Sequence, residues 1–404
     1  MRARVTTAAT VALATALSAT ASAQPAAVTP NAVTTTLVGR LDLERYKATI
    51  KGLTAFGDRR QGTERNRRAV DWIDAQLKGY GCATERLKYV FDPPPASTPA
   101  PTPAPPAASG PPPIPTAVGG GRPRGTRTRT SVNTDPMRQP DEKLRALNTG
   151  PTTPGPRELV YCTKVGSKFP NEMYIVGAHM DGHGWGEAAN DDGSGTALVM
   201  EIARVFSMPD VVTERTIRFV LWNNEETGLN GARAYVEQRQ ALQGLETPLG
   251  SGRYPEPTWQ GMIQHDMMLF DHGMPRADGT MSPEQRPEAD VNIEFQSTAK
   301  RSLEAQKLAW YFHAANAKYA TDYPAQVGPH MTNTDSTPFM DVVPSISLRE
   351  NERGVHVGSG WDPHWHQPTD VFATFSDKDF RLGLNAAQTT LGAVADLTGT
   401  TLTR

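Results

Sequence analysis

Apolar positions along the chain follow two spacings, one typical of strands and the other typical of helices. Continuous or alternating apolar runs predict strands over residues 82–91, 158–164, 173–178, 216–222, 260–268 and 345–348. A recurrence every three to four residues predicts helices over residues 63–79, 196–206, 229–240 and 376–397. Thr63 and Ser376 stand where helix N-caps are expected, and Gly79 is placed to end the first helix.

The strands and helices alternate, which is typical of a sheet buried between two layers of helices. We therefore expect an α/β fold, with a mostly parallel central sheet and helices on both faces. Residues 41–92 and 157–404 are expected to form this single domain. Ligands in such folds bind beyond the carboxyl ends of the strands, so polar residues at those ends are candidates for a site.

Residues 93–156 interrupt the domain and have a composition that cannot form a core. Half of the residues from 93 to 116 are proline, and glycine, arginine and threonine dominate from 119 to 130. A segment so poor in apolar side chains buries too little surface to offset the entropy of ordering it. We expect an extended, polyproline-like or disordered insertion. Binding of its prolines by a partner is the alternative.

The first 23 residues have the parts of an export signal. Arg2 and Arg4 precede a mildly apolar stretch, and the small residues 21–23 offer a cleavage site. A disordered alanine-rich tail or an uncleaved anchor is the alternative. Export would make the protein secreted or periplasmic, and in an oxidising compartment Cys82 and Cys162 are expected to form a structural disulfide.

Charge and composition argue against two classes of partner. The 404 residues include 41 Lys plus Arg and 43 Asp plus Glu, for a net charge of -2, which gives no field for attracting nucleic acid. No run approaches the roughly 20 apolar residues of a membrane span, so none is expected in the mature chain. Two cysteines are too few for a cysteine-rich zinc module. Nothing in the composition indicates an oligomeric state.

Histidine and acidic residues follow the predicted strands. His179 ends the strand over 173–178, and Asp181 can face the same way two residues later. A metal-bound imidazole usually donates its other N–H to a carboxylate, which Asp181 could supply to His179. Asp191 and Asp192 lie in a glycine-rich turn before a helix, where helix capping is the alternative to metal binding.

Three further acids are costly to bury unless they have partners. Glu225 and Glu226 follow the strand over 216–222, where an exposed turn is the alternative. In a metal site, one glutamate can bind the ion while its neighbour takes a proton from a metal-bound water. Asp266 lies in an apolar strand and needs a cation or several donors, whereas its neighbour His265 is expected to face the other way.

A histidine pair near the C-terminus completes the candidates. His366 is the expected ligand, with Asp370 as its orienting partner and His364 and His356 as alternatives. The remaining histidines are expected to be ordinary loop or packing residues: His183, His272, His313 and His330.

The order of these residues resembles the co-catalytic di-zinc aminopeptidases of peptidase family M28, which also contains glutamate carboxypeptidases and glutaminyl cyclases. Five motifs carry the resemblance: His179-x-Asp181, Asp191-Asp192-Gly-Ser-Gly, Glu225-Glu226-Thr-Gly, Asp266, and His366-x-Pro-x-Asp370. It covers residues 41–91, which include Arg60-Gln61-Gly62-Thr63, and residues 160–397. The resemblance implies the phosphorylase/hydrolase-like fold of zinc exopeptidases.

The resemblance also implies two zinc ions per chain and a role for each residue. Asp191 would bridge the ions, one of which would also bind Glu226 and His366 and the other His179 and Asp266. Glu225 is implied as the general base, Asp181 as the partner of His179, and the peptide between Asp191 and Asp192 as cis. The sequence departs from the family in reading His-Asp-Met-Met around Asp266 and Thr334-Asp335-Ser336 where Ser-Asp-His is common.

Histidine and carboxylate without thiolate suit zinc, manganese or cobalt. Two ions would activate a shared hydroxide, and Glu225 would take its proton and return it to the leaving nitrogen. We expect a secreted zinc-dependent aminopeptidase that acts on the N-termini of peptides. The alternatives are a carboxypeptidase, for which Arg349 and Arg353 could form a basic pocket, a glutaminyl cyclase with one zinc, or a binding module that has lost catalysis.

Overall fold

The computed structural model describes residues 29–92, 132–271, 291–329, 331, 333–350 and 362–403. The predicted signal sequence lies outside these residues, as do residues 93–131 of the predicted insertion. Within the described residues, no helix is both long and apolar enough to cross a bilayer.

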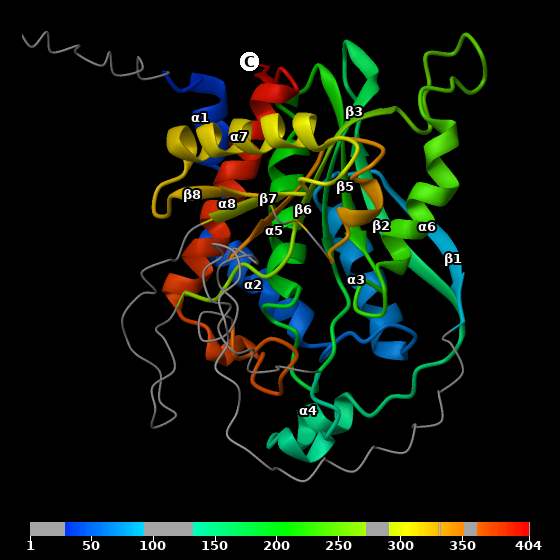
Figure 1. The fold of residues 1–404 in the computed structure, drawn as a ribbon, viewed down its shortest axis with the longest axis vertical. Helices are drawn as coiled ribbons and strands as arrows, with labels where there is room; N and C mark the ends of the chain where they lie inside the picture. The colour runs from blue at the N-terminus through cyan, green and yellow to red at the C-terminus, as the bar shows by residue number, and fades with distance from the viewer. Residues whose placement is uncertain are drawn as a thin grey trace, which may run out of the picture.

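A sheet of eight strands forms the middle layer of the described residues (Figure 1), in the order β1-β2-β5-β3-β6-β9-β7-β8. Its strands are β1 (Thr84–Phe91), β2 (Gly155–Lys164), β3 (Phe169–His179), β5 (Arg215–Trp222), β6 (Thr258–His265), β7 (Val291–Phe295), β8 (Ala325–Gly328) and β9 (Ser345–Arg349). The four central strands, β5, β3, β6 and β9, are parallel. Antiparallel pairing joins β1 to β2, β2 to β5 and β7 to β9. The mostly parallel centre is therefore confirmed.

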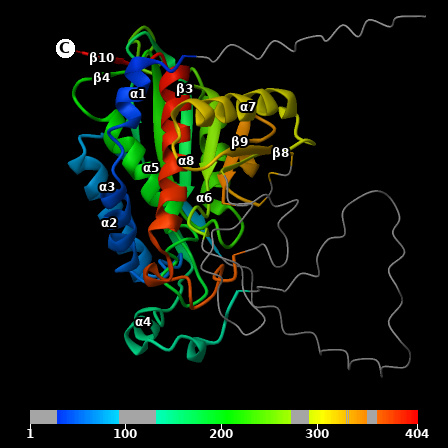
Figure 2. The same ribbon diagram turned by 90° about the vertical axis from the view of Figure 1, so that its left-hand side faces the viewer.

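Helices cover both faces of this sheet, as expected. They are α1 (Ala32–Val38), α2 (Leu43–Thr54), α3 (Glu64–Gly79), α4 (Glu142–Leu147), α5 (Gly193–Phe206), α6 (Asn230–Arg239), α7 (Ser302–Tyr319) and α8 (Asp377–Leu397). Figure 2 shows α2, α3, α5 and α8 layered on one side of the strands. A short pair of strands, β4 (Val211–Val212) and β10 (Thr401–Leu402), lies apart from the main sheet.

Two apolar cores lie on the two faces of the sheet. On β3, Val176 and Ala178 belong to the core beneath α5 and α8, while Met173 and Ile175 belong to the core beneath α6. This alternation follows from the period of two residues in a strand. Because both faces are covered, the central strands read as continuous apolar runs, which is the pattern that predicted them.

The predicted caps of two helices and the disulfide are confirmed, whereas the helix predicted from residue 196 begins at Gly193. Thr63 caps α3 by accepting a hydrogen bond from the Asn66 amide, and Ser376 caps α8 in a reciprocal arrangement with Asp379. Cys82 and Cys162 form a disulfide that links the residues ahead of β1 to β2. The bond ties the segment before the insertion to the segment after it.

The prediction of disorder is wrong for residues 132–156. This segment contains a 3-10 helix (Pro136–Arg138), α4 and the start of β2. Polar side chains rather than an apolar core hold it in place: the Gln139 amide donates to the carbonyls of Trp185 and Pro368, and the Asn148 amide donates to that of Gly186. Composition alone could not show these contacts, because they depend on loops far away in the sequence.

Candidate metal centre

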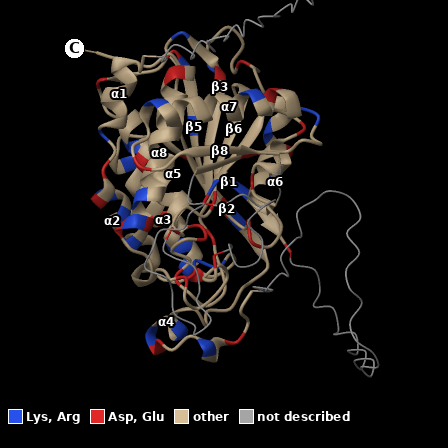
Figure 3. Cartoon of the chain, turned by 60° about the vertical axis from the view of Figure 1, so that its left-hand side comes forward, with Lys and Arg blue, Asp and Glu red and all other residues tan. Residues whose placement is uncertain are grey.

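The five predicted metal ligands lie together at the carboxyl ends of the central strands. His179 is the last residue of β3, and Asp266 directly follows β6 rather than lying within it. Glu226 lies in the turn after β5, Asp191 in the turn before α5, and His366 in the loop before α8. These loops lie between the sheet and α4 (Figure 1), and acidic segments gather there (Figure 3).

The two carboxylate oxygens of Asp191 face two different imidazoles. Oδ1 lies 3.2 Å from His179 Nε2, and Oδ2 lies 3.0 Å from His366 Nε2. Asp266 Oδ1 lies 3.7 Å from His179 Nε2, while Glu226 Oε2 lies 3.0 Å from His366 Nε2. Asp191 therefore stands between one His–Asp pair and one His–Glu pair, as a carboxylate that bridges two cations would.

Neighbouring carboxylates hold the Asp191 turn in this position. The peptide between Asp191 and Asp192 is cis, as the resemblance implies. Asp192 caps α5 by accepting from the Gly195 amide and also accepts from the amides of His179 and Met267. Helix capping, the alternative for this acidic pair, thus applies to Asp192 and leaves the carboxylate of Asp191 turned toward the imidazoles.

Two predicted partnerships differ in the structure. His179 Nδ1 lies 2.9 Å from the main-chain carbonyl of Asp181 and 3.8 Å from its carboxylate, so the carbonyl is the closer partner. Asp370 accepts from the amides of Asn190 and Asp191, where we expected it to orient His366. In both cases a backbone group forms the hydrogen bond that we expected between two side chains. The spacing of side chains along the sequence does not reveal such backbone partners.

Glu225, the predicted general base, is buried beside the ligands. Its main-chain amide donates a hydrogen bond to Asp181 Oδ1 at 3.0 Å. The Asp181 carboxylate therefore positions Glu225, and not the imidazole of His179 as we expected. Asn223 anchors the same turn by exchanging two amide hydrogen bonds of 3.0 Å with Asn66 of α3. The Tyr89 hydroxyl donates to the Asn223 carbonyl. This network fixes where the strand ends and hence where Glu225 stands.

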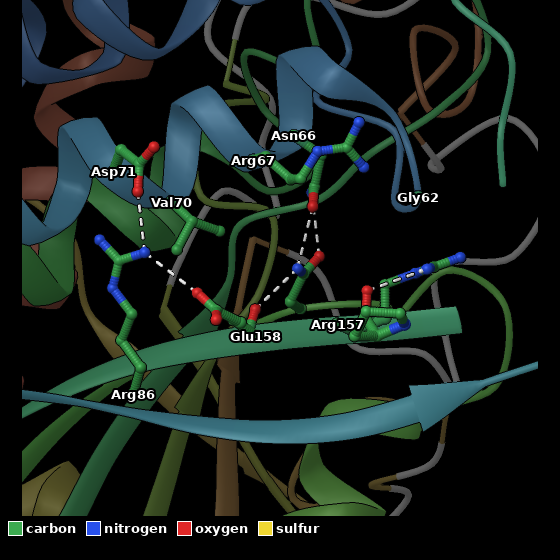
Figure 4. Close-up of a pocket in the computed structure, with 10 residues that line it drawn as sticks. Gly62, Asn66, Arg67, Val70, Asp71, Arg86, Arg157 and Glu158 are labelled. Atoms are coloured by element: carbon green, nitrogen blue, oxygen red, sulfur yellow. Dashed lines mark hydrogen bonds and ion pairs between the residues drawn. The ribbon is translucent and has the colours of Figure 1, made fainter. Parts of the chain in front are cut away.

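A surface pocket of about 200 Å³ lies on the other side of this Asn66–Asn223 pair (Figure 4). None of the five predicted ligands lines it. Three of its charged residues are engaged with one another, since Arg86 pairs with Asp71 and Glu158. We therefore assign the chemistry to the buried carboxylates. The pocket is a neighbouring feature that is also lined by Asn223.

The electrostatics of the buried ligands favour a cation. Burial raises the pKa of the Glu225 carboxyl well above its ordinary value and raises that of Asp181 to about 6. Burial also opposes the ionisation of Glu226, but the imidazoles of His183 and His366 outweigh it and lower its pKa to about 2. The carboxylates in turn outweigh the effect of burial on His366 and raise its pKa to about 10.

The donor set fits zinc. Among the described residues, three groups of three donors have atoms within 4.8 Å of one another: His179, Asp191 and Glu226; His179, Asp192 and Asp266; and His183, Glu226 and His366. Nitrogen and carboxylate oxygen without thiolate match the ligands that zinc takes in catalytic sites. Glu226 Oε1 is buried and makes no hydrogen bond, which is a cost that a bound cation would remove.

His183, which we expected to be an ordinary loop or packing residue, lies beside two of the predicted ligands. Its Nε2 lies 3.0 Å from Glu226 Oε2, and its ring packs edge to face on His366, with 4.1 Å between ring centroids. Its position four residues after His179 in a glycine-rich loop was the available signal. His265 faces away from the ligands and bonds Thr390 of α8, as predicted.

The other described histidines belong to none of these donor groups. His364 bonds the Thr369 hydroxyl at 2.8 Å, and His313 packs on Trp310 of α7. The remaining three lie outside the described residues: His272, His330 and His356.

Two further buried residues lie near the predicted ligands. Arg349 Nη2 lies 2.6 Å from Asp266 Oδ2, so this guanidinium already serves a predicted ligand. Asp335 is fully buried and accepts from the Gln264 amide at 3.3 Å. Burial raises the pKa of its carboxyl well above the ordinary value.

Comparison with known proteins identifies relatives of this chain. The model of "Peptidase family M28" matches residues 159–387. Carboxypeptidase Q of Xenopus laevis is 40% identical over 73 residues, which are 18% of this chain and 16% of that protein. A probable lipoprotein aminopeptidase of Mycobacterium tuberculosis, LpqL, is 39% identical over 92 residues, 22% of this chain and 18% of that protein. The matches thus span less than a fifth of the length of these relatives.

The fold also matches a solved structure over most of the chain. The aminopeptidase from Aneurinibacillus sp. strain AM-1 superposes with a TM-score of 0.57 at 18% identity, covering 90% of this chain and 95% of that one. At this identity the match supports the fold, and the argument for the chemistry comes from the side chains described above.

Proposed function

The chain belongs to peptidase family M28, and we propose on that basis that it is a zinc-dependent aminopeptidase with two ions per chain. One observation carries the proposal: the two oxygens of Asp191 face His179 and His366, each of which has a further carboxylate beside it. In this assignment, His179 and Asp266 hold one ion, Glu226 and His366 hold the other, and Asp191 bridges them. The protein would cleave N-terminal residues from peptides.

Zinc bound there would lower the pKa of a water molecule and polarise the substrate carbonyl. The chain supplies the proton transfer. The Glu225 carboxylate would accept the proton of the attacking water and return it to the leaving nitrogen. Its raised pKa, caused by burial, brings the carboxyl closer to the working pH of a general acid and base. Asp181 keeps Glu225 in place through the Glu225 amide.

The charges around the ligands favour a substrate amino group over a carboxylate. Arg349, one of the two arginines that could have bound a substrate carboxylate, is 1% exposed and engaged by Asp266 and Glu294. The other, Arg353, lies outside the described residues. Asp335 instead adds another buried carboxyl near the base. An acidic surrounding attracts the ammonium of a peptide N-terminus and repels the carboxylate of a C-terminus. This observation supports the aminopeptidase over the carboxypeptidase.

Neither a glutaminyl cyclase nor a binding module has a supporting observation. A glutaminyl cyclase would work with one zinc, but the proposed donors of both ions lie beside one another around Asp191. A binding module without catalysis would not need Glu225 held beside the ligands by Asp181. We therefore keep these two functions only as outcomes of the test.

The test is a substrate panel with the purified full chain. Aminoacyl anilides should be hydrolysed, the activity should disappear with a chelator, and added zinc should restore it. Peptides with a blocked N-terminus and a free C-terminus, and peptides with N-terminal glutamine, report carboxypeptidase and cyclase activity. Anilide hydrolysis that is indifferent to chelation, or turnover of the blocked peptides alone, would reject the aminopeptidase.

We also propose export through the first 23 residues, on the basis of their sequence. Expression in a host with an active secretory pathway should give a released protein that begins at Gln24. Mass spectrometry of the N-terminus checks the cleavage site. A protein retained in the cytoplasm with its first residues intact would contradict export.

A further inference from the structure

His183 offers a donor atom that the proposed set of five ligands leaves unused. Its side chain is 13% exposed, and Nε2 lies 3.0 Å from Glu226 Oε2. Nε2 is itself buried and makes no hydrogen bond of acceptable geometry. A buried ring nitrogen without such a bond costs stability, so a partner for it is expected.

Two imidazoles converge on the same carboxylate oxygen. Nε2 of His183 and Nε2 of His366 both lie 3.0 Å from Glu226 Oε2. The two rings meet edge to face at an interplanar angle of 89°. On the other side of this group, Glu226 Oε1 is buried and also lacks a hydrogen bond. The donor atoms of His183, Glu226 and His366 lie within 4.8 Å of one another, as the ligands of one cation would.

We propose that His183 is a ligand of the ion held by Glu226 and His366. The proposal rests on the proposed two-ion function, and it makes the two halves of the centre unequal. One half would have four protein donors, from His183, Glu226, His366 and Asp191. The other half would have three, from His179, Asp266 and Asp191. Sites closed by four protein ligands are typical of firmly held zinc, whereas three leave a position open for chemistry.

The inequality assigns different tasks to the two ions. The half with His183 would hold its ion tightly and keep Asp191 and Glu226 in place. The half with His179 would exchange its ion more readily and leave room for the substrate. A chelator added at increasing concentrations should therefore remove the zinc of the wild-type protein in two separate steps. The chelator concentration needed for the second step should depend on His183.

A purely packing role for His183 is the rival explanation. The ring could orient His366 by edge-to-face contact without binding an ion. The variant His183→Phe separates the two roles, because phenylalanine keeps an aromatic ring but offers no donor nitrogen. The variant His183→Ala removes both. His313→Ala is the matched control, since His313 packs on Trp310 of α7 and belongs to none of the three donor groups.

The experiment measures zinc per chain by elemental analysis after dialysis of the full-length protein against a series of buffered zinc concentrations. Circular dichroism of each variant checks that the fold is retained. In both His183 variants, the affinity for the tighter ion should fall at least about 10-fold, and the control should match the wild type. Replacing zinc with cobalt should show the same change as an altered visible absorption spectrum of the tighter site.

Each result decides between the explanations. Unchanged affinity in both His183 variants, or normal affinity in His183→Phe alone, would overturn the proposal. A wild type that binds only one ion at saturating zinc would reject the two-ion function. In that case, loss of this single ion in both variants would still identify His183 as a ligand, and its retention would refute that role.

Discussion

Two buried polar clusters lie on this sheet, and they handle charge in opposite ways. In the first, Arg218 of β5 pairs with Glu256, and both contact the Tyr235 hydroxyl. The Trp259 indole also donates to Glu256. One cation meets one carboxylate, and the hydroxyl and the indole satisfy the remaining oxygen of Glu256. Such a cluster is complete within the protein and is expected to be structural.

The metal centre lacks this balance. Its carboxylates include those of Asp191, Glu225, Glu226 and Asp266. Among the described residues, the guanidinium of Arg349 is the one that forms an ion pair with them. Some of its atoms lack hydrogen bonds, among them Asp181 Oδ2 and Glu226 Oε1. Burying more carboxylates than cationic partners is costly, so this cluster is expected to be completed by cations from outside. The contrast shows that charge balance, and not burial alone, separates a structural cluster from a candidate active site.

The substitution Glu225→Gln should show most strongly that the metal centre, and not the Arg218–Glu256 cluster, carries the activity. The substitution keeps the shape of the side chain but removes its ability to carry a proton, so turnover of aminoacyl anilides should fall by about 10²- to 10⁴-fold. Zinc content should stay at the wild-type value, because Glu225 is not a proposed ligand. The exposed Glu237→Gln on α6 is the control. Retained turnover in Glu225→Gln would reject this residue as the base.

Glu256→Gln tests the balanced cluster. The change leaves the charge of Arg218 buried without its carboxylate, so the free energy of unfolding should fall by about 3–5 kcal/mol. Zinc content per folded chain should not change. Urea unfolding followed by circular dichroism measures the first quantity, again with Glu237→Gln as control. A loss of zinc without a loss of stability would show that the two clusters have been assigned the wrong roles.

Zinc should stabilise the folded protein through the metal centre only. With free zinc at 100 times the dissociation constant, binding should raise the free energy of unfolding by about 2.7 kcal/mol. The increase should persist in Glu256→Gln and disappear in Asp191→Asn, whose side chain no longer carries the charge that faces both imidazoles. Urea unfolding with and without zinc gives both values. An equal increase in Asp191→Asn would contradict the bridging role.

The sequence was sufficient for the parallel centre of the sheet, which follows from hydrophobic periodicity. It also supplied the five ligand candidates, through the motifs that carry the resemblance to family M28. It was insufficient where a contact joins distant loops. The ordered segment over 132–156 rests on polar bonds to loops far along the chain, such as that of Gln139 with Pro368. The partners of Asp181 and Asp370 are backbone amides whose positions depend on the complete fold.

His183 shows the same limit within the site. A single histidine in a glycine-rich loop is usually a solvated residue, and its position four residues after His179 is the one local signal for another role. Its role depends on the loop carrying His366, which brings that ring to within 4.1 Å between centroids. Helices α1, α2 and α7 and strands β7 and β8 were also not predicted. Their apolar residues fill the cores, yet their short or mixed patterns gave no separate signal.

The decisive quantity for the two-ion centre is the zinc content of the folded chain saturated with zinc and freed of excess metal, in the wild type and in Asp191→Asn. Elemental analysis should find two ions per chain in the wild type and fewer than one in the variant, with circular dichroism unchanged. Two ions in both proteins, or none in the wild type, would contradict a centre built around Asp191.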